Sequence, residues 1–336
     1  LLWLAPLAMA RPAEYRSQRR RSRDNKPALV WQERDTEILR AVWLNRFLTR
    51  ELLLVLLPPG APPAHITTAA TPKQPGTNLD RRLAKLFHHG YLDRLRTEIG
   101  GPLIYALTRK GGERLGELRP DLDPGGKSSR WSRNWEEINR NARPANIDHT
   151  LALARVRCAL EATTRAGAFA LDTFKREGED LKAEWKTRQG RRYVIPDAFV
   201  ILADHRDQKP RRYAFFFEID RSTMKASRMA DKFARYADLY EARMHKTYFG
   251  VPSFRVLTVC KSAERARNLR ALVRGEFTPP HARAPLKAPL PEKLRSFFYF
   301  IDEASFAEPQ NILAATWSPA HADDRLGIIP QPLPIA

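Results

Sequence analysis

Residues 194–240 of this 336-residue chain contain two apolar runs that both carry carboxylates, and this region limits the possible folds most strongly. The runs read YVIPDAFVIL and RRYAFFFEIDRSTM, and a segment of helical character containing DKFARYADLY follows them. Asp197 lies at the head of the first run, and Glu218 and Asp220 lie near the end of the second. Short apolar runs bounded by polar segments are typical of buried strands. We therefore expect two neighbouring strands followed by a helix.

The three carboxylates are expected to converge if these strands pair. Residues two apart on a strand share a face, so Glu218 and Asp220 are predicted to project to the same side. The apolar residues expected on the opposite, core side are Phe215, Phe217 and Ile219. Like charges held close together are costly unless a cation lies between them, and Mg²⁺ or Mn²⁺ is the usual occupant of such a site. The sequence therefore predicts a metal site formed by Asp197, Glu218 and Asp220.

A purely structural role would also explain these side chains. Asp197 could cap a turn after Pro196, and the other two carboxylates could pair with arginines near the strand ends, which are Arg211, Arg212 and Arg221. Under this interpretation the domain has a degenerate site without catalysis, or its fold is an unrelated one.

The charge of the chain indicates a polyanionic partner. Lys and Arg number 58 against 38 Asp and Glu, which gives a net charge of +20 and a pI of about 10.3. Nucleic acid is the usual partner of so basic a protein. A membrane surface is also anionic, but the sequence lacks a run of about 18 apolar residues that could span one. The two cysteines, Cys158 and Cys260, form no disulfide framework or metal-binding pair, which favours the reducing cytoplasm.

The first residues, LLWLAPLAMA, are similar to the apolar region and cleavage site of a signal peptide but lack its positively charged leader. We expect the chain to start at Met9 instead. Residues 1–28 are predicted to form a disordered basic arm, because the part after Met9 is rich in arginine and almost free of apolar residues. Such an arm would lie along a DNA backbone or remain a solvated tail.

Residues 29–118 predict three helices and then a β-hairpin. Asp35 and Thr49 are expected to cap the first two helices, and the third is expected from Asn78 to a C-terminal cap at Gly90. The segments YLDRLR and LIYALTRKG then predict two short strands. This order is that of a winged helix-turn-helix domain, in which the third helix enters the major groove of DNA.

The polar face of the third helix supplies candidate DNA contacts, which are Arg81, Arg82 and Lys85. Further basic residues are candidates for contacts with the phosphate backbone: Lys73, Arg94, Arg96, Arg109 and Lys110. The net charge favours double-stranded DNA as the partner, although winged helices also serve as protein-interaction modules.

A linker and an α/β domain are expected after the hairpin. Residues 119–146 are polar and rich in Pro, Gly, Ser and Arg, as linkers are. Residues 147–318 begin with a helix, and FALDTF and LKAEWKTR are expected to form the first strand and its neighbour. Later come the strand FRVLTVC, a helix capped by Ser262, and LRSFFYFIDEASF as a last strand and helix. Alternating strands and helices predict an α/β sheet with helices packed on it, and residues 319–336 predict a Pro-rich tail.

The second domain resembles the PD-(D/E)xK nuclease superfamily. Pro196 and Asp197 match the PD, and the tripeptide from Glu218 to Asp220 stands where the superfamily has (D/E)-x-K. Asp220 thus replaces the lysine that helps to activate the attacking water. The resemblance implies a restriction-endonuclease-like α/β fold in which Lys232, from the following helix, compensates for that lysine. It also implies catalytic roles for Asp197, Glu218, Asp220 and Lys232, with Mg²⁺ or Mn²⁺ as the cofactor.

Most of residues 30–318 resembles the replication-relaxation family. The motifs that carry the resemblance are LTRKG, PDA, FFFEIDRSTM, KFARY and FFYFIDEAS, together with a helix that starts at His149. The family is encoded on bacterial plasmids and integrative elements. Membership implies a DNA-binding accessory protein in replication or conjugative mobilisation, with a relaxase or other replication proteins as partners. The alternative is a non-enzymatic initiator or transcriptional regulator, in which the carboxylates only stabilise the fold.

Overall fold

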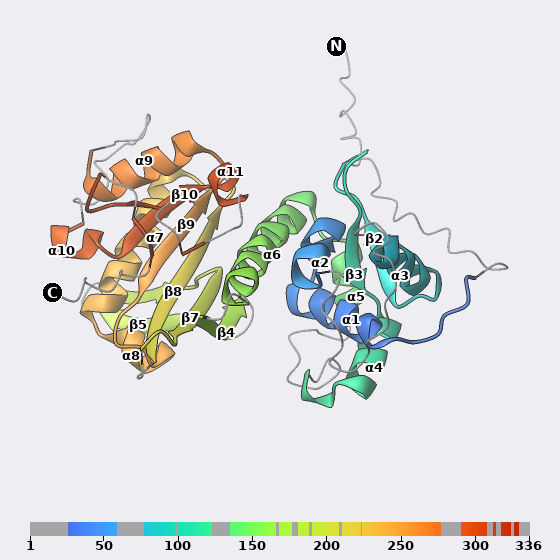
Figure 1. Cartoon of the computed structure of the whole chain (residues 1–336). Coiled ribbons are helices and arrows are strands. Elements are labelled where there is room, and N and C mark those ends of the chain that lie inside the picture. The colour runs from blue at the N-terminus through green and yellow to red at the C-terminus, as the bar shows by residue number, and fades with distance from the viewer. Residues whose placement is uncertain are drawn as a thin grey trace, which may run out of the picture. The chain divides into compact units, whose positions relative to one another are not determined.

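The computed structural model divides into two compact units, Leu1–Ala154 and Arg155–Ala336 (Figure 1). It describes residues 26–58, 77–98, 100–122, 135–165, 168–176, 181–187, 190–207, 210–222, 224–276, 290–307, 312–313, 317–323 and 326–328. Most of the expected basic arm, Lys73, and much of the expected linker and tail lie outside the described residues. The division falls inside helix α6 (Pro144–Thr164), so each unit includes part of that helix.

The first unit contains helices and one small antiparallel sheet. Its elements in chain order are α1 (Glu33–Asn45), β1 (Leu48–Thr49), α2 (Arg50–Leu56), α3 (Thr77–His88), β2 (Leu92–Leu95), β3 (Ile104–Leu107), α4 (Arg109–Leu118), a 3₁₀ turn (Pro120–Leu122) and α5 (Trp135–Arg140). Strand β3 lies between β1 and β2 and pairs antiparallel with both. The three helices and the hairpin that the sequence predicts are therefore present, and β1 is an additional short strand.

Polar side chains cap the starts of the first two helices, and a glycine follows the end of the third. The first helix starts two residues before Asp35, because Gln32 is its N-cap and Asp35 completes a capping box with it. The α2 cap is Thr49, as predicted, since its hydroxyl accepts a hydrogen bond from the backbone of Leu52. Gly90 follows α3 with a φ of +77°, a conformation that glycine adopts without strain.

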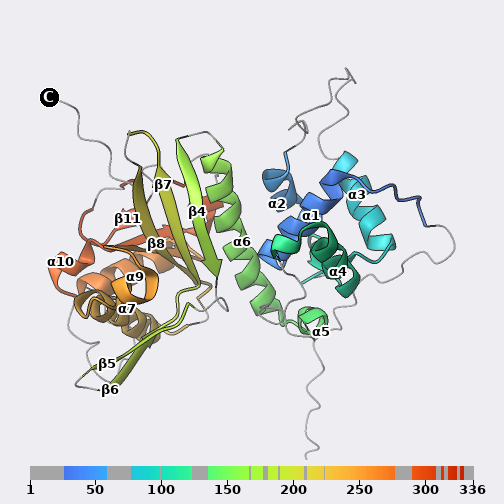
Figure 2. The same cartoon turned by 90° about the horizontal axis from the view of Figure 1, so that it is seen from below.

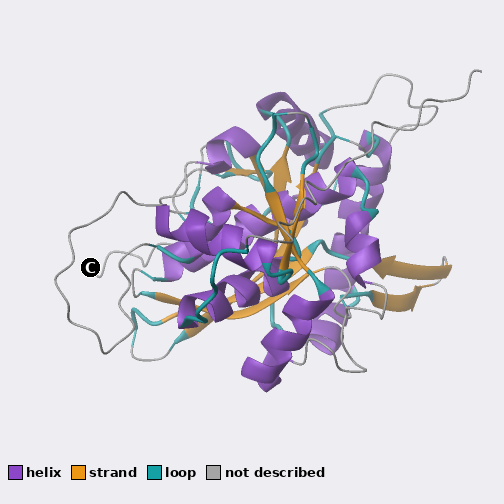
Figure 3. Cartoon of the chain, turned by 90° about the vertical axis from the view of Figure 1, so that its right-hand side faces the viewer, coloured by secondary structure: helices purple, strands orange, loops and turns teal. Residues whose placement is uncertain are grey.

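The second unit is organised around a six-stranded mixed sheet with the strand order β11-β10-β9-β8-β7-β4. The strands are β4 (Phe169–Arg176), β7 (Ala198–Asp204), β8 (Arg211–Asp220), β9 (Arg255–Cys260), β10 (Phe298–Asp302) and β11 (Ser318–Pro319). Strands β4, β7 and β8 form an antiparallel meander, and β9 and β10 continue the sheet parallel to β8. The mixed helix and strand content confirms the α/β class (Figure 3).

One predicted pairing is wrong. The segment LKAEWKTR was expected beside the first strand, but it forms β5 (Ala183–Thr187) and pairs with β6 (Gly190–Val194) in a separate hairpin. The apolar side chains of this hairpin, Ala183, Trp185 and Val194, join the core around α7. The hairpin therefore packs its apolar face against α7 and does not pair with the strands of the six-stranded sheet.

Helices cover the sheet and fix its core. They are α7 (Ala226–Glu241), α8 (Met244–Phe249), α9 (Ala263–Arg274), α10 (Glu292–Arg295) and α11 (Glu303–Ala307). The crossovers from β8 to β9 and from β9 to β10 run through α7 and α9, and both helices contribute to one core cluster. No helix of the described residues is long and apolar enough to cross a membrane.

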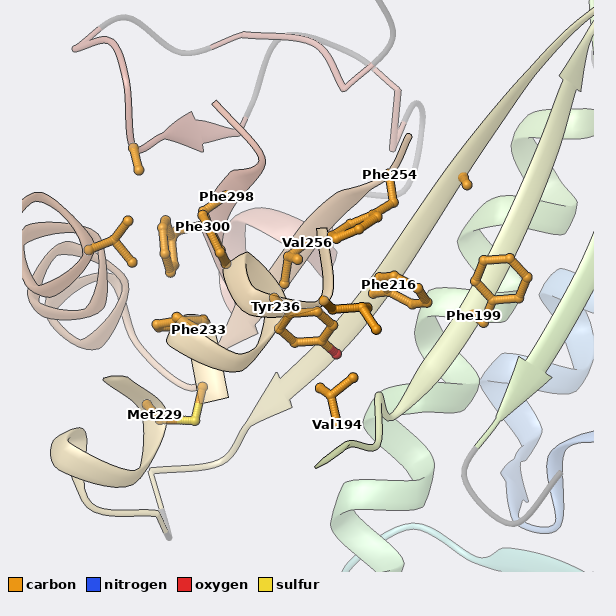
Figure 4. Packing of buried hydrophobic residues seen from close by; sticks show 14 of the residues in the cluster. Val194, Phe199, Phe216, Met229, Phe233, Tyr236, Phe254, Val256, Phe298 and Phe300 are labelled. Atoms are coloured by element: carbon orange, nitrogen blue, oxygen red, sulfur yellow. The ribbon is translucent and has the colours of Figure 1, made fainter. Parts of the chain in front are cut away.

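The core between α7 and the sheet is aromatic. Figure 4 shows Tyr236 of α7 beside Phe216 of β8, and their ring centroids are 5.5 Å apart. Phe233, one turn earlier, packs edge-to-face against Phe298 and Phe300 of β10. These contacts hold α7 in a fixed rotation over β8, and that rotation decides which α7 side chains reach the end of the strand. The C-terminal half of α6 covers β4 (Figure 2). The Arg157 guanidinium of α6 lies 5.0 Å from the centroid of the Phe174 ring on β4.

Candidate functional site

Strand pairing places Asp197 beside Glu218. Ala198 at the start of β7 pairs with Phe217 of β8, so the residue before Ala198 lies opposite the residue after Phe217. The Asp197 amide donates to the Phe217 carbonyl at 3.1 Å, and Asp197 Oδ2 accepts from the Ile219 amide at 2.7 Å. Asp197 is therefore anchored to the backbone of the strand that carries Glu218.

Helix α7 adds two groups to this pair of carboxylates. Lys232 Nζ donates to Glu218 Oε2 and lies 3.9 Å from Asp197 Oδ1. Tyr236, one turn later on the same helix face, donates its hydroxyl to Glu218 Oε1. The structure thus brings together three of the four predicted catalytic residues, and it adds Tyr236, which sequence reasoning missed. The spacing of four residues from Lys232 in the KFARY motif was the signal that could have identified Tyr236.

Burial changes the acid–base properties of this site. The Glu218 side chain is buried, with 2% of the residue exposed, and burial raises its pKa to about 8. The charge of Asp197 adds to this increase, whereas the Lys232 ammonium and the hydrogen bonds oppose it. Burial also raises the pKa of Tyr236 well above its ordinary value, so its hydroxyl remains a donor. Glu218 can therefore exchange a proton near neutral pH, and a bound cation would favour its charged form.

Asp220 does not join the cluster, so the prediction of three converging carboxylates is wrong. It projects to the same side as Glu218, but Arg265 of α9 donates to Asp220 Oδ2 at 2.5 Å. The Ser222 amide also donates to Asp220 at 3.3 Å. Within the described part of the chain, no group of three or more His, Cys, Asp or Glu side chains is placed to hold a metal ion. The physical reason is that Arg265, one crossover later, already neutralises this carboxylate.

Two carboxylates, Asp197 and Glu218, remain as the groups that would hold a small hard cation. Mg²⁺ keeps several waters and is commonly bound through one or two carboxylates together with phosphate oxygens of the substrate. Asp197 and Glu218 provide two carboxylates from adjacent strands, and the Asp197 side chain is held by the backbone of β8. These two residues, without Asp220, are the ones that would hold the ion.

Arg82 is not available to DNA, which corrects its predicted role as a contact. It is 4% exposed and forms a two-pronged ion pair with the buried Asp35 of α1, with Nε 2.7 Å from Oδ1. It also donates to the Val30 carbonyl at 2.9 Å. Arg82 therefore ties α3 to α1 and to the segment before α1. Charge along α3 alone could not reveal a buried partner so distant in the sequence.

The other two α3 candidates differ in exposure. Arg81 is exposed and donates to the Asn78 side chain at 3.1 Å. Lys85 is half-buried and donates to the Ala28 carbonyl at 2.6 Å. Arg81 is therefore the α3 candidate whose guanidinium remains at the surface.

The candidates after α3 also divide by burial. Arg94 is half-buried over the Phe87 ring, 4.2 Å from its centroid, and desolvation lowers the pKa of Arg94. Lys110 is exposed, donates to the His89 carbonyl at 3.0 Å and lies over the Tyr91 ring. The remaining two candidates are a half-buried residue, Arg96, and an exposed one, Arg109. Of these four candidates, the two exposed ones, Arg109 and Lys110, therefore lie at the start of α4.

The family model for replication-relaxation proteins matches residues 63–252, which is more than half of the chain. The protein belongs to the replication-relaxation family. The matched range of this replication-relaxation protein includes α3, both strands of the candidate site, and α7 with Lys232 and Tyr236. Neither a curated protein nor a solved structure matches the chain.

In this replication-relaxation protein, Arg82→Ala should lower the free energy of unfolding by about 3–5 kcal/mol, because it leaves Asp35 buried without its partner. Urea denaturation followed by circular dichroism measures the loss. Arg81→Ala is the matched surface control and should change stability by less than about 0.5 kcal/mol. Equal effects of the two substitutions would contradict the buried ion pair.

If Asp197 and Glu218 hold a divalent ion, Mg²⁺ or Mn²⁺ should raise the thermal unfolding midpoint, because a ligand that binds only the folded state stabilises it. Asp197→Asn and Glu218→Gln should each remove this increase. Asp231→Asn, a more exposed carboxylate beside Lys232 on α7, should keep it. A metal-dependent increase that persists in both site variants would show that the ion binds elsewhere.

Proposed function

We propose that this protein is a DNA-binding accessory protein for replication or conjugative mobilisation of a plasmid or integrative element, and that its second unit nicks DNA in a metal-dependent reaction. Its partners would be double-stranded DNA and a relaxase or other replication proteins. The observation that carries the proposal is the convergence of Asp197, Glu218 and Lys232 at the junction of β7 and β8.

The topology around this junction supports a restriction-endonuclease-like domain. An antiparallel meander of β4, β7 and β8 is followed by α7 and by β9, which is parallel to β8. The PD dipeptide immediately precedes β7, Glu218 lies near the end of β8, and the lysine comes from α7. This arrangement agrees with the relocated lysine that the PD-(D/E)xK resemblance implies.

Each side chain has a role in the proposed hydrolysis. A divalent ion held by Asp197 and Glu218 would polarise a phosphoryl oxygen and lower the pKa of a bound water. Lys232 would donate to the phosphate oxygens as negative charge develops on them. Tyr236 would hold the Glu218 carboxylate in one orientation through its hydrogen bond. The aromatic core behind Tyr236 would keep α7 in place during the reaction.

We propose a winged helix for the first unit. The order α1-β1-α2-α3-β2-β3, with β3 at the centre of a small antiparallel sheet, supports this assignment. In such a domain α3 enters the major groove of DNA and the hairpin approaches the backbone. Arg81 would then contact DNA from α3, and Arg109 and Lys110 would contact phosphates. The net charge of +20 is consistent with this partner.

One observation favours the second candidate function, a non-enzymatic initiator or regulator. Both carboxylate oxygens of Glu218 already have partners in the protein, Lys232 and Tyr236. The cluster is therefore stable without an ion, as expected if the site only holds α7 against β8.

Supercoiled plasmid carrying DNA of the protein's own element should be nicked in Mg²⁺ or Mn²⁺ and remain intact in EDTA. Glu218→Gln should abolish nicking without weakening DNA binding, because the amide cannot ionise to hold a cation and the shape of the side chain is preserved. Agarose electrophoresis reports nicking and a gel shift reports binding, with Asp231→Asn as the active control. A gel shift with intact plasmid for every protein would exclude the nuclease and favour the regulator.

Arg81→Ala should weaken duplex binding and reduce the slope of log affinity against log salt by about one, as expected for one lost phosphate contact. Fluorescence anisotropy over a series of salt concentrations gives this slope. An unchanged slope for Arg81→Ala would exclude α3 from the DNA interface.

A further inference from the structure

The β5–β6 hairpin has a buried face and an exposed face. Glu184 pairs with Tyr193 and Lys186 pairs with Arg191, and side chains alternate along each strand. Ala183, Trp185 and Val194 face the core, where Figure 4 shows Val194 close to Tyr236. The residues on the opposite face are Lys182, Glu184, Lys186, Arg191 and Tyr193. Figure 2 shows the hairpin extending past the six-stranded sheet.

Two exposed tyrosines adjoin the same residue of this hairpin, Glu184. Tyr193 is 45% exposed and Tyr248 of α8 is 46% exposed, and among the Phe, Trp and Tyr side chains of the described residues these two are the exposed ones. Tyr193 lies across the strand pair from Glu184, and the Tyr248 hydroxyl donates to the Glu184 carbonyl. Both tyrosines are therefore neighbours of Glu184. Exposed aromatic rings provide flat surfaces on which unpaired bases stack.

Two cations lie over the Tyr193 ring. Lys182 Nζ lies 5.5 Å from the Tyr193 ring centroid, and the Arg235 guanidinium of α7 lies 4.9 Å from it. The outer face of the hairpin carries three cationic side chains and one carboxylate, Glu184, which pairs with both Lys182 and Arg191. Its net charge is therefore positive, which suits a phosphate backbone.

Both sides of this surface adjoin residues of the candidate site along the chain. Arg235 follows Lys232 by one helical turn on α7, so the two side chains are neighbours on the helix surface. On the hairpin side, Val194 ends β6 only three residues before Asp197. A DNA strand lying along the hairpin would therefore reach Asp197, Glu218 and Lys232.

We propose that the outer face of the hairpin, with Tyr248 and Arg235, is a binding site for single-stranded DNA that directs the strand to the cluster of Asp197, Glu218 and Lys232. The inference rests on the proposed function, because it specifies single-stranded DNA as the form of DNA that the proposed nuclease site receives. Tyrosine rings would stack on bases, and Lys186 and Arg191 would contact phosphates. Single strands fit better than duplex DNA, since the base faces of a duplex are already covered by stacking.

The test uses the full chain carrying Glu218→Gln, so that binding is measured without cleavage. A fluorescent oligothymidine strand and a duplex of equal length are the probes, and anisotropy is recorded in EDTA. Tyr193→Ala should weaken binding of the single strand by about tenfold and leave duplex binding unchanged. Tyr193→Phe should bind like the parent, because the ring is retained.

A double variant provides independent evidence. Lys186→Ala with Arg191→Ala should reduce the salt slope for the single strand by about 1.4, which corresponds to two phosphate contacts. Lys261→Ala with Arg267→Ala, which removes two exposed cations beside and on α9, is the matched control and should not change that slope. Thermal unfolding midpoints check that every variant is folded.

The proposal fails if Tyr193→Ala binds the single strand as tightly as the parent, or if both double variants lower the salt slope equally. These outcomes are separable from failure of the proposed nicking. Loss of single-strand binding in Tyr193→Ala, without plasmid nicking by the wild-type protein, would refute the nuclease and retain the hairpin site. Plasmid nicking by the wild-type protein, together with normal single-strand binding by Tyr193→Ala, would refute the hairpin site and retain the nuclease.

Discussion

The contact between Glu218 on β8 and the pair Lys232 and Tyr236 on α7 is the interaction on which the second unit depends. A buried carboxylate is costly unless its oxygens are satisfied, and here both have partners from one helix face. These partners can reach β8 only in one rotation of α7, which is also the rotation that packs Phe233 against β10. The polar site and the aromatic core therefore require the same helix position.

The sequence predicted the features that arise from local pattern. Alternation along β8 correctly placed Glu218 and Asp220 on one side, and hydroxyl caps marked the starts of α2 and α9. The prediction of the site required only that the two apolar runs, which form β7 and β8, pair with each other. Strands joined by a short connection commonly pair antiparallel, so this pairing was predictable.

Features that depend on distant partners were not predictable in the same way. Arg82 looked like a surface cation, but its role is decided by Asp35 on another helix. Asp220 looked like a metal ligand until α9 brought Arg265 beside it. The β5–β6 hairpin has strand-like sequence, yet its choice of partner depends on the apolar surface of α7. In each case the deciding group is one that no local pattern specifies.

The pairing of Asp220 with Arg265 has a consequence for the order in which DNA and an ion would arrive at the proposed nuclease site. Three uncompensated carboxylates would repel a phosphate backbone until an ion had bound. With Asp220 neutralised and Lys232 between the other two carboxylates, the cluster carries at most one net negative charge. Protonation of Glu218, whose pKa is about 8, reduces that charge further. In the proposed nuclease, the electrostatic barrier to an incoming DNA strand would therefore be low before any ion binds, so the strand would be able to arrive first and its phosphate would help to recruit the ion.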